Sequence, residues 1–327
     1  MIQLTKQRAK EILNAIGGRN ILVLGDVMLD EFVWGDVTRI SPEAPIPVVD
    51  VQRESVHLGG AANVLANVIS LGACASVTGV VGKDRAGEQL RSTLSQITSQ
   101  DGNLVSDESR PTTLKTRIIA HSQPVVRTDR ESRAAVDSGI EDMVIERLQA
   151  EVPRADALVV SDYDKGAVTP RILETILPLA YKRIPVLIDP KLRNFKSYRP
   201  ATLITPNHFE ALRMSNSEED SDAGLHLAAK RIRADLNCDA VLITRGARGM
   251  MLLETDSDPI YVKTAAREVY DVTGAGDTVI AALAAALAAG ATMLEAATFA
   301  NQAAGIVVGK VGTATVSPDE LISTFED

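Results

Sequence analysis

Short apolar runs alternate with amphipathic segments along most of this chain. Residues 21–25 form an uninterrupted apolar run that ends in a glycine, which is typical of a strand buried on both faces of a parallel sheet. From residue 139 onward the order of helix, strand and loop becomes regular, with strands expected at 157–161, 186–189, 203–205 and 240–244. The pattern predicts a doubly wound α/β fold with a mostly parallel sheet.

Two segments, residues 31–51 and 113–129, depart from this pattern because polar and apolar positions alternate along them. Three prolines separate the short strands expected in the first segment, and prolines do not fit a central sheet. We expect the two segments to form a small β lid, with 113–129 as its hairpin. Lys115, Arg117 and Arg127 fall on odd positions, so each strand presents its cations to one face. A solvated strand face or an anion-binding face would account for them.

Composition narrows the classes of function. Apolar residues make up 45% of the 327 residues and charged residues 24%, as in an average globular protein. The net charge of −9 is spread along the chain without a basic stripe, which argues against a nucleic-acid partner. The longest apolar run, about 279–289, is too short to span a bilayer, and the polar N-terminus does not resemble a signal peptide. We expect a cytoplasmic protein with a single domain over 1–327 and no membrane partner.

The run from Asp271 to Asp277 holds the most distinctive chemistry. Two aspartates enclose Gly274, Ala275 and Gly276, and an alanine-rich apolar run follows. This predicts a tight turn that opens a buried helix, whose unpaired N–H groups and dipole attract anions. Beside a bound phosphate, Asp277 would be suited to take a proton from an attacking hydroxyl. On this motif alone, a simple helix cap is an equal alternative.

Further polar groups follow the first strand. Asp26 and Asp30 come at its C-terminal end, which is where ligands bind in open α/β sheets. Gly59 and Gly60 would let a ligand approach the backbone, and Asn63 offers an amide on the first turn of a helix expected to begin within 57–63. These groups suit the recognition of hydroxyls, although turn and cap aspartates are equally compatible with the pattern.

A second pair of oxygen ligands stands in the middle of the chain. Asn207 and Glu210 are three residues apart at an expected helix start, so they share one face. Such a pair could bind a hydrated Mg²⁺, which usually takes only one or two protein oxygens. A helix-capping arrangement explains the same spacing equally well.

Taken together, these motifs resemble the ribokinase-like (PfkB) sugar kinases over essentially the whole chain. The residues that carry the resemblance are 59–63, 207–210 and 271–277, in the family's order. Within the family, residues 25–49, 162–166 and 189–191 resemble the branch that phosphorylates D-glycero-D-manno-heptose 7-phosphate. That branch converts the C1 hydroxyl to the 1,7-bisphosphate, on the route to ADP-heptose for lipopolysaccharide. Many of its members are fused to a nucleotidyltransferase domain; this chain resembles a stand-alone kinase or a truncated form.

The resemblance implies roles for individual residues. It makes Asp277 the base, and residues Gly274, Ala275 and Gly276 the anion hole for the transferred phosphoryl group. It implies that Asn207 and Glu210 organise Mg²⁺ through water, and that Lys191 contacts phosphate. Sugar hydroxyls would be held by Asp26 or Asp30 together with Gly59, Gly60 and Asn63. The loops that face ATP would contain Asn207, Thr244, Gly246, Gly249 and Asn301. The cations expected at the 7-phosphate are Lys115, Arg117, Arg127 and Arg193.

The resemblance also implies ATP as co-substrate and Mg²⁺ as cofactor, with a monovalent cation as a further candidate. Another sugar phosphate, such as fructose 6-phosphate or tagatose 6-phosphate, is an alternative substrate, and a sugar-phosphate sensor without turnover is a second alternative. A dinucleotide-dependent dehydrogenase is disfavoured because the first strand is not followed by Gly-x-Gly-x-x-Gly. Since unpaired strand edges seek partners, we expect a homodimer through the lid.

Overall fold

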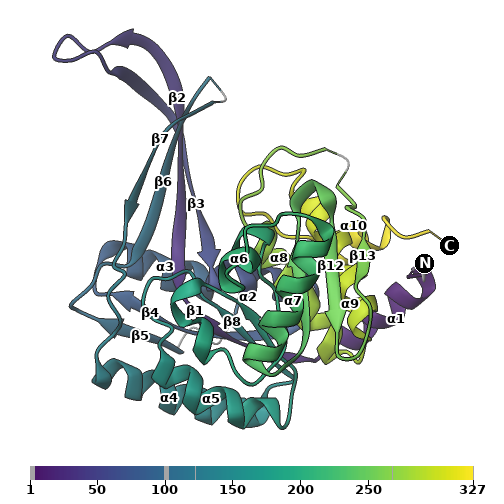
Figure 1. The fold of residues 1–327 in the computed structure, drawn as a ribbon. Helices are drawn as coiled ribbons and strands as arrows, with labels where there is room; N and C mark the ends of the chain where they lie inside the picture. The colour runs from purple at the N-terminus through teal and green to yellow at the C-terminus, as the bar shows by residue number, and fades with distance from the viewer. Residues whose placement is uncertain (1–3, 99–102, 122, 267, 327) are drawn as a thin grey trace.

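The main body is built on a nine-stranded sheet with the order β13-β12-β11-β10-β9-β8-β1-β4-β5 (Figure 1). The computed structural model describes residues 4–98, 103–121, 123–266 and 268–326. Neighbouring strands are parallel from β5 to β11, and β12 and β13 are added antiparallel. The strands are β1 (Asn20–Gly25), β4 (Cys74–Gly82), β5 (Leu104–Asp107), β8 (Ala157–Ser161), β9 (Val186–Asp189), β10 (Ala201–Ile204), β11 (Cys238–Thr244), β12 (Met250–Glu254) and β13 (Ile260–Val262). The predicted doubly wound, mostly parallel sheet is confirmed.

Helices cover both faces of this sheet, and the alternation along β1 shows why. Ile21 and Val23 belong to one hydrophobic cluster, whereas Leu22 and Leu24 belong to the other, so the strand buries both faces. The first cluster is covered by α1 (Lys6–Ile16), α2 (Ala61–Ser70), α3 (Arg85–Ser95), α8 (Ala275–Ala288), α9 (Met293–Val307) and α10 (Pro318–Ile322). The second is covered by α4 (Ser138–Glu151), α5 (Pro170–Tyr181), α6 (His208–Met214) and α7 (Asp222–Leu236). No helix within the described residues is long and apolar enough to cross a membrane.

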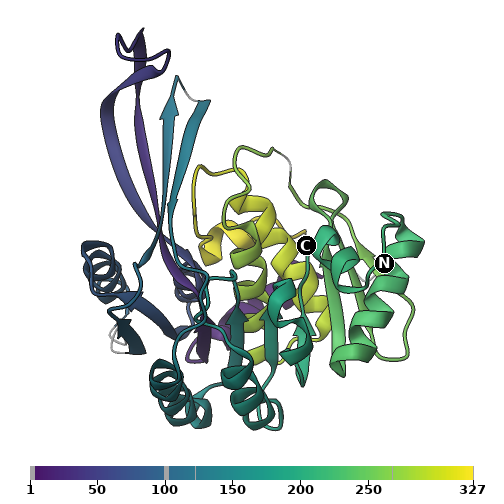
Figure 2. The same ribbon diagram turned by 60° about the vertical axis from the view of Figure 1, so that its left-hand side comes forward.

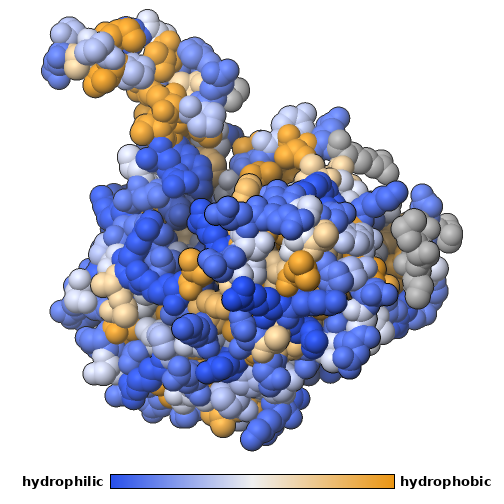
Figure 3. All heavy atoms as spheres, viewed as in Figure 1, coloured by the Kyte–Doolittle hydropathy of each residue, from blue (hydrophilic) through white to orange (hydrophobic). Residues whose placement is uncertain are grey.

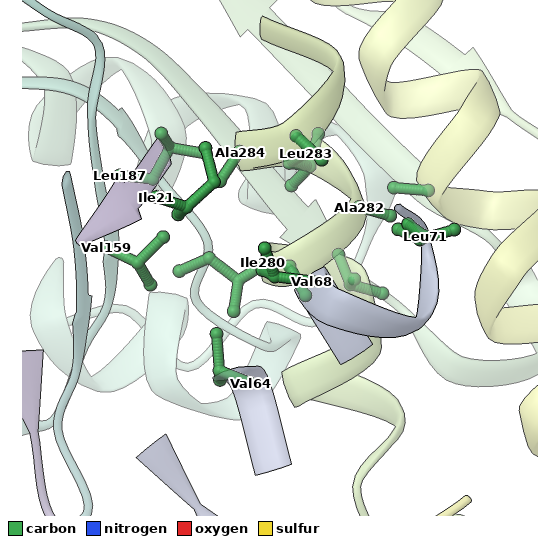
Figure 4. Packing of buried hydrophobic residues seen from close by; sticks show 14 of the residues in the cluster. Ile21, Val64, Val68, Leu71, Val159, Leu187, Ile280, Ala282, Leu283 and Ala284 are labelled. Carbon is green, nitrogen blue, oxygen red and sulfur yellow. The ribbon is translucent and has the colours of Figure 1, made fainter. Parts of the chain in front are cut away.

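Helix α8 lies at the centre of the first cluster. Ten consecutive residues from Asp277 to Ala286 are buried, and the five alanines among them let neighbouring elements approach closely. Figure 4 shows Ile280 close to Val64 and Val68 of α2, with strand residues such as Val159 on the other side. The helix that carries Asp277 is therefore fixed by the core.

A four-stranded second sheet projects from the body (Figures 1 and 2). It has the order β3-β2-β6-β7, and only the β2–β6 pair is parallel. Its strands are β2 (Val27–Ile40), β3 (Pro47–Gly60), β6 (Thr113–Ala120) and β7 (Gln123–Arg130). We call this sheet the lid. Ser122, inside the predicted hairpin, lies outside the described residues.

The lid strands are longer than the sequence pattern suggested. The helix expected to begin within 57–63 is present, but residues 57–60 are not part of it, because they pair with residues 27–30 as the end of β3. The helix begins only at Ala61, after Gly60 takes a φ of 55°. Ladder hydrogen bonds with β2 outweighed the local helical pattern, and they place both glycines on a strand.

The direction in which successive strands are added to the sheet reverses between β1 and β8. Strands β4 and β5 follow β1 on one side, while β8, β9 and β10 extend the sheet on the other. At such a switch in strand order, the loops after neighbouring strands diverge and leave a crevice in which ligands bind. The loops after β1 and β8 meet there.

Candidate active site

Asp277 lies in the first turn of α8, where the backbone is shaped by glycine. Gly274, the residue before the helix, has a φ of 78°, and a Cβ there would come within 2.7 Å of Asn63 Nδ2. The Ala275 N–H donates to the Val272 carbonyl at 3.2 Å, so one of the three expected anion-hole donors is used within the turn. For Gly274 and Gly276, the described residues provide no hydrogen-bond acceptor to the N–H. Those two donors are the ones available to an anion.

The carboxylate of Asp277 is buried, with 1% exposure, and each of its oxygens accepts one hydrogen bond. Asn63 Nδ2 donates to Oδ2 at 2.8 Å, and the Tyr163 hydroxyl donates to Oδ1 at 2.7 Å. Burial raises the pKa of Asp277 to about 7, while these two hydrogen bonds act to lower it. A carboxylate with that pKa can exchange a proton near neutral pH.

The Asn63 amide is itself oriented by buried neighbours. Asn67 Nδ2 donates to the Asn63 carbonyl at 2.9 Å and to its side-chain oxygen at 3.2 Å. Thr278 in turn donates to Asn67 Oδ1 at 2.9 Å. Because the Asn63 side-chain oxygen accepts a hydrogen bond from Asn67, the Asn63 side-chain nitrogen is the atom that faces Asp277.

The two aspartates after β1 have different surroundings. Asp26 accepts hydrogen bonds from the N–H groups of Tyr163 at 2.8 Å, Lys165 at 3.1 Å and Ala167 at 3.1 Å. Burial, together with the nearby Asp162, raises the pKa of Asp26 to about 6. Asp26 is therefore committed to holding the loop after β8, and only Asp30 extends toward the lid.

Asp30 lies where the lid joins the body. Its carboxylate pairs with the Arg117 guanidinium, and it lies so close to Gly59 that a Cβ there would be 2.3 Å from Oδ2. Asp30 also contributes to the raised pKa of Asp277. The Gly59 backbone, Asp30 and Asp277 thus surround one region at the base of the lid.

A small pocket of about 160 Å³ adjoins Asp277's helix on the side of β9. Its lining includes Asp189, Lys191, Asn207, Glu210 and Gly276. Asn207 and Glu210 form a capping box, with reciprocal hydrogen bonds of 3.0 Å, and Glu210 also pairs with Lys191. Burial raises the pKa of Asp189 to about 8, with a further contribution from Glu210. Asn207 and Glu210 therefore do cap the start of α6, as one of the two interpretations of their spacing predicted. Lys191 lies beside Glu210.

The pocket has the character expected of a phosphate and cation site. Burial acts to lower the pKa of Lys191, but Asp189 and Glu210 outweigh it and raise that pKa. No group of three or more His, Cys, Asp or Glu side chains in the described chain is placed to hold a metal ion by itself. Mg²⁺ at phosphate sites uses fewer protein oxygens and keeps its waters, so a carboxylate-rich pocket of this kind fits it.

A larger, mostly apolar pocket of about 320 Å³ adjoins the first, and Gly276 lines both. It is lined by the four residues that the family resemblance implied for the nucleotide side, namely Thr244, Gly246, Gly249 and Asn301. Asn301 Nδ2 donates to the Lys263 carbonyl at 2.8 Å, which ties α9 to the segment after β13. The structure therefore brings these four residues together next to the helix that carries Asp277.

The lid forms one wall of a third cavity, of about 900 Å³, whose opposite wall contains Tyr270, Asp271 and Thr273. Strand register arranges the side chains of one lid face in three rows about 7 Å apart. From the body outward, the rows are His57–Asp30–Lys115–Asp129, Ser55–Phe32–Arg117–Arg127 and Arg53–Trp34–Ile119–Pro124. All members of the outer two rows except Ser55 line the cavity.

The cations expected at the distal phosphate are not equivalent. Arg127 lines the cavity and pairs with Asp129 at 2.9 Å, whereas Arg117 is held by Asp30. Lys115 belongs to the innermost row, where burial and Lys165 lower its pKa. Arg193 is separate from the lid rows: it pairs with Asp164 at 2.8 Å and donates to the Arg133 carbonyl at 2.6 Å. The expected role of Arg193 at the phosphate is not supported by its position.

Two residues at this site were missed from the sequence. Arg53 stacks on Trp34, with its guanidinium carbon 3.9 Å from the ring centroid, and lacks a carboxylate partner among the described residues. Tyr163 donates a hydrogen bond to Asp277, whereas the sequence analysis used it only as part of the 162–166 motif. The sequence alone does not show that Arg53 lies opposite Trp34, because this pairing depends on the antiparallel register of β2 and β3.

The fold and site define a class of protein. Asp277 is a buried carboxylate at a helix N-terminus, and the turn before it lines both a mostly apolar pocket and a cavity with a β lid as one wall. This is the arrangement expected of a small-molecule kinase. The family model described as "pfkB family carbohydrate kinase" matches residues 19–320. The chain belongs to this family and is a phosphotransferase.

Known relatives agree with this assignment. The chain is 46% identical over 317 residues to "Bifunctional protein HldE" of Geotalea uraniireducens, with 97% of this chain and 63% of the relative covered. The protein of the same name from Geobacter metallireducens is 46% identical over 307 residues, covering 94% and 63%. The chain thus spans less than two thirds of the length of these relatives.

Solved structures share the fold at low identity. Ribokinase of Arabidopsis thaliana, complexed with ribose and ATP, gives a TM-score of 0.72 at 18% identity, covering 95% of this chain and 99% of that one. Phosphofructokinase-2 of Escherichia coli in complex with potassium gives 0.77 at 19% identity, covering 94% and 98%. The ribokinase-like fold, with a large mostly parallel sheet and a small sheet as lid, is confirmed.

Proposed function

We propose that this protein uses ATP to phosphorylate the C1 hydroxyl of D-glycero-D-manno-heptose 7-phosphate, a step toward ADP-heptose and lipopolysaccharide. The observation that carries the proposal is the position of Asp277, with a pKa raised to about 7 by burial, near Asp30 at the base of an arginine-lined lid cavity. A sugar phosphate has hydroxyls for the base of the lid and a phosphate for its arginines. The motifs shared with heptose kinases support the choice of sugar.

In the proposed reaction, Asp277 accepts the proton of the sugar hydroxyl as that oxygen attacks the γ-phosphorus of ATP. The new bond joins the sugar oxygen to phosphorus, the bond to the β–γ bridging oxygen breaks, and ADP leaves. Lys191 and the N–H groups of Gly274 and Gly276 face the charge that develops on the transferred group. Asp30, the Gly59–Gly60 backbone and Asn63 orient the sugar so that the attack is in line.

The pocket of Asn207 and Glu210 fits a hydrated Mg²⁺ held mainly by the phosphates of ATP. Bound there, the ion would neutralise phosphate charge, while Thr244, Gly246, Gly249 and Asn301 would contact the nucleotide. A monovalent cation remains a prediction for this chain, because the potassium in the name of the Escherichia coli structure belongs to that protein.

The distal phosphate of the substrate would lie against the outer rows of the lid. Arg53 is suited to it because stacking on Trp34 fixes the plane of the guanidinium and leaves its N–H edge free for two parallel hydrogen bonds. Arg127 and Arg117 add positive charge from the adjacent row. Closing the lid on this phosphate would exclude water from the reaction.

A panel of sugar phosphates assayed with ATP tests the proposal, with ADP release as the rate and ³¹P NMR to locate the new phosphate. We expect the highest kcat/KM for heptose 7-phosphate, with the new phosphate on C1. A higher value for fructose 6-phosphate or tagatose 6-phosphate would overturn the choice of sugar. Binding without turnover for every sugar would instead favour a sensor.

We further propose that body and lid act as one kinase domain and that two copies associate through their lids. Large apolar side chains are exposed along the lid, and Figure 3 shows hydrophobic residues gathered on this projecting part. They are Ile40 (60% exposed), Ile46 (56%), Val51 (49%), Val125 (40%) and Val126 (48%). A second copy is the simplest occupant because β3 and β7 are also free sheet edges.

Sedimentation of the wild type and of Ile46→Asp tests this association. We expect a dimer that becomes a monomer in the variant, with Leu179→Asp, an exposed apolar position on α5 (46%), as the matched control that stays dimeric. A monomeric wild type at working concentration would count against a lid-mediated dimer.

A further inference from the structure

The loop that follows β8 is mostly buried and is anchored by several hydrogen bonds. Asp26, at the end of β1, accepts three backbone N–H groups from it, those of Tyr163, Lys165 and Ala167. Asp162, at the start of the loop, is also buried and accepts hydrogen bonds from Asn194 at 2.7 Å and from the Tyr198 hydroxyl at 2.6 Å. The backbone around Tyr163 is therefore held in one position by buried carboxylates on both sides.

This anchoring aims the Tyr163 side chain at the reaction centre. Its hydroxyl donates to Asp277 Oδ1 at 2.7 Å, and its ring packs near Gly60, where a Cβ would be 3.5 Å from Tyr163 Cδ2. The Lys191 ammonium lies 5.7 Å from the ring centroid. Burial and the charges of Asp277 and Asp189 raise the pKa of Tyr163 well above its usual value, so its hydroxyl remains a proton donor.

We propose that Tyr163 is a positioning residue that fixes the carboxylate of Asp277 and keeps it ionised for proton abstraction. This inference rests on the proposed role of Asp277 as the base. With Asn63 on one oxygen and Tyr163 on the other, rotation of the carboxylate about its Cβ–Cγ bond is blocked. Each oxygen keeps one lone pair for the proton of the sugar hydroxyl.

The electrostatic surroundings explain why a second donor is needed. Burial and Asp30 both favour the protonated form of Asp277, and the neighbouring Asp189 adds another carboxyl to the site. Lys191 and the hydrogen bonds from Asn63 and Tyr163 favour the ionised form. Removing one of these donors shifts the balance toward a protonated carboxyl, which cannot act as a base.

The test is Tyr163→Phe, which removes the hydroxyl but keeps the ring and the backbone N–H that bonds Asp26. We expect kcat to fall about tenfold, the effect of losing one hydrogen bond to a charged group. The acidic limb of the kcat–pH profile should move upward by about one pH unit, because the pKa of Asp277 rises. A residue with a merely structural role would change the melting temperature without moving that limb.

Two companion measurements keep the test decisive. Tyr181→Phe removes a matched hydroxyl, which donates to Asp239 at 2.8 Å away from the site, and should leave the limb in place. Placing 3-fluorotyrosine, a stronger donor, at position 163 keeps the fold intact and should shift the limb downward. An unmoved limb in both variants at position 163 would overturn the inference. The proposed base would fail separately, if the wild type showed no acidic limb or Asp277→Asn kept its turnover.

Discussion

The buried residues around Asp277, which form the floor of the site, and the lid differ in how their side chains are held in place. In the body, Asp277, Asn63 and Asp26 are at most 2% exposed, and each is held by side-chain or backbone hydrogen bonds from other elements. In the lid, all eight residues of β7 are exposed, Arg127 among them, and Arg53 of β3 is also exposed, whereas Arg117 is half-buried beside Asp30. The comparison indicates that the candidate reactive groups are fixed by the core, whereas the side chains proposed to bind the substrate are placed by strand register on an exposed sheet.

The largest expected effect is on chemistry in the floor. Asp277→Asn keeps the volume of the side chain but cannot accept a proton, so we expect kcat to fall by about 10²–10⁴-fold. ATP affinity, measured by calorimetry, should change little because the nucleotide pocket is intact. Asp142→Asn, which alters an exposed carboxylate on α4, is the control and should retain the wild-type rate.

The next largest effect should be on stability, because side chains are packed more tightly in the body than in the lid. Ile280→Ala, at a fully buried position of α8, should lower the free energy of unfolding by about 2–5 kcal/mol through the cavity it leaves. Ile118→Ala, at a half-buried position of lid strand β6, should lower it by less than about 1 kcal/mol. Denaturant midpoints at constant slope measure both, and equal losses would contradict the contrast.

Recognition by the lid should be affected without damage to the floor. Arg53→Ala should reduce kcat/KM for the sugar phosphate by about 10- to 100-fold, as expected for a charge-assisted hydrogen-bonding pair, and leave the KM for ATP unchanged. Arg39→Ala removes the same charge from the lid outside the cavity lining and serves as the control. Equal losses in both variants would point to overall charge instead of a defined contact.

The smallest effect concerns pH and the pocket below the lid. Burial raises the pKa of Asp189 to about 8, so the folded protein favours its neutral form. Its contribution to stability is full below the pKa of the unfolded chain and is lost as pH rises through the folded value. The stability of Asp189→Asn relative to the wild type should therefore be greater at pH 8.5 than at pH 5. We expect about 1–2 kcal/mol, because part of the side chain remains accessible.

Thermal unfolding of both proteins at the two pH values measures this difference. An identical difference at pH 5 and pH 8.5 would mean that Asp189 is ionised throughout. The exposed Asp142→Asn variant should show no such pH dependence.

Local sequence was sufficient to predict those features that depend on a single helix, strand or turn. The apolar run after Asp277 predicted the buried helix α8, and the run at 21–25 predicted a strand with two buried faces. The glycines of 271–277 marked a turn that only a positive φ at Gly274 permits. The lid was also visible in its alternation, because period-two patterns are local.

Contacts between distant elements could not be predicted in the same way. Pairing between β3 and β2 delayed the start of the helix expected within 57–63 to Ala61. The choice between Asp26 and Asp30 depended on the loop after β8. Arg53 and Trp34 are 19 residues apart and meet only because the β2–β3 register aligns them. Tyr163 and Asp277, 114 residues apart, meet because β8 ends beside the N-terminus of α8.

By itself, the sequence determined which elements form and which chemical groups are available, since periodicity and glycine conformation act over a few residues. The tertiary structure decided which carboxylates are buried, which are occupied by backbone donors and which arginines face the cavity. Burial and register are properties of packed neighbours, and they set both the pKa of Asp277 and the rows of the lid. The order of strands placed Asp277 at the base of the lid, and the core holds it there.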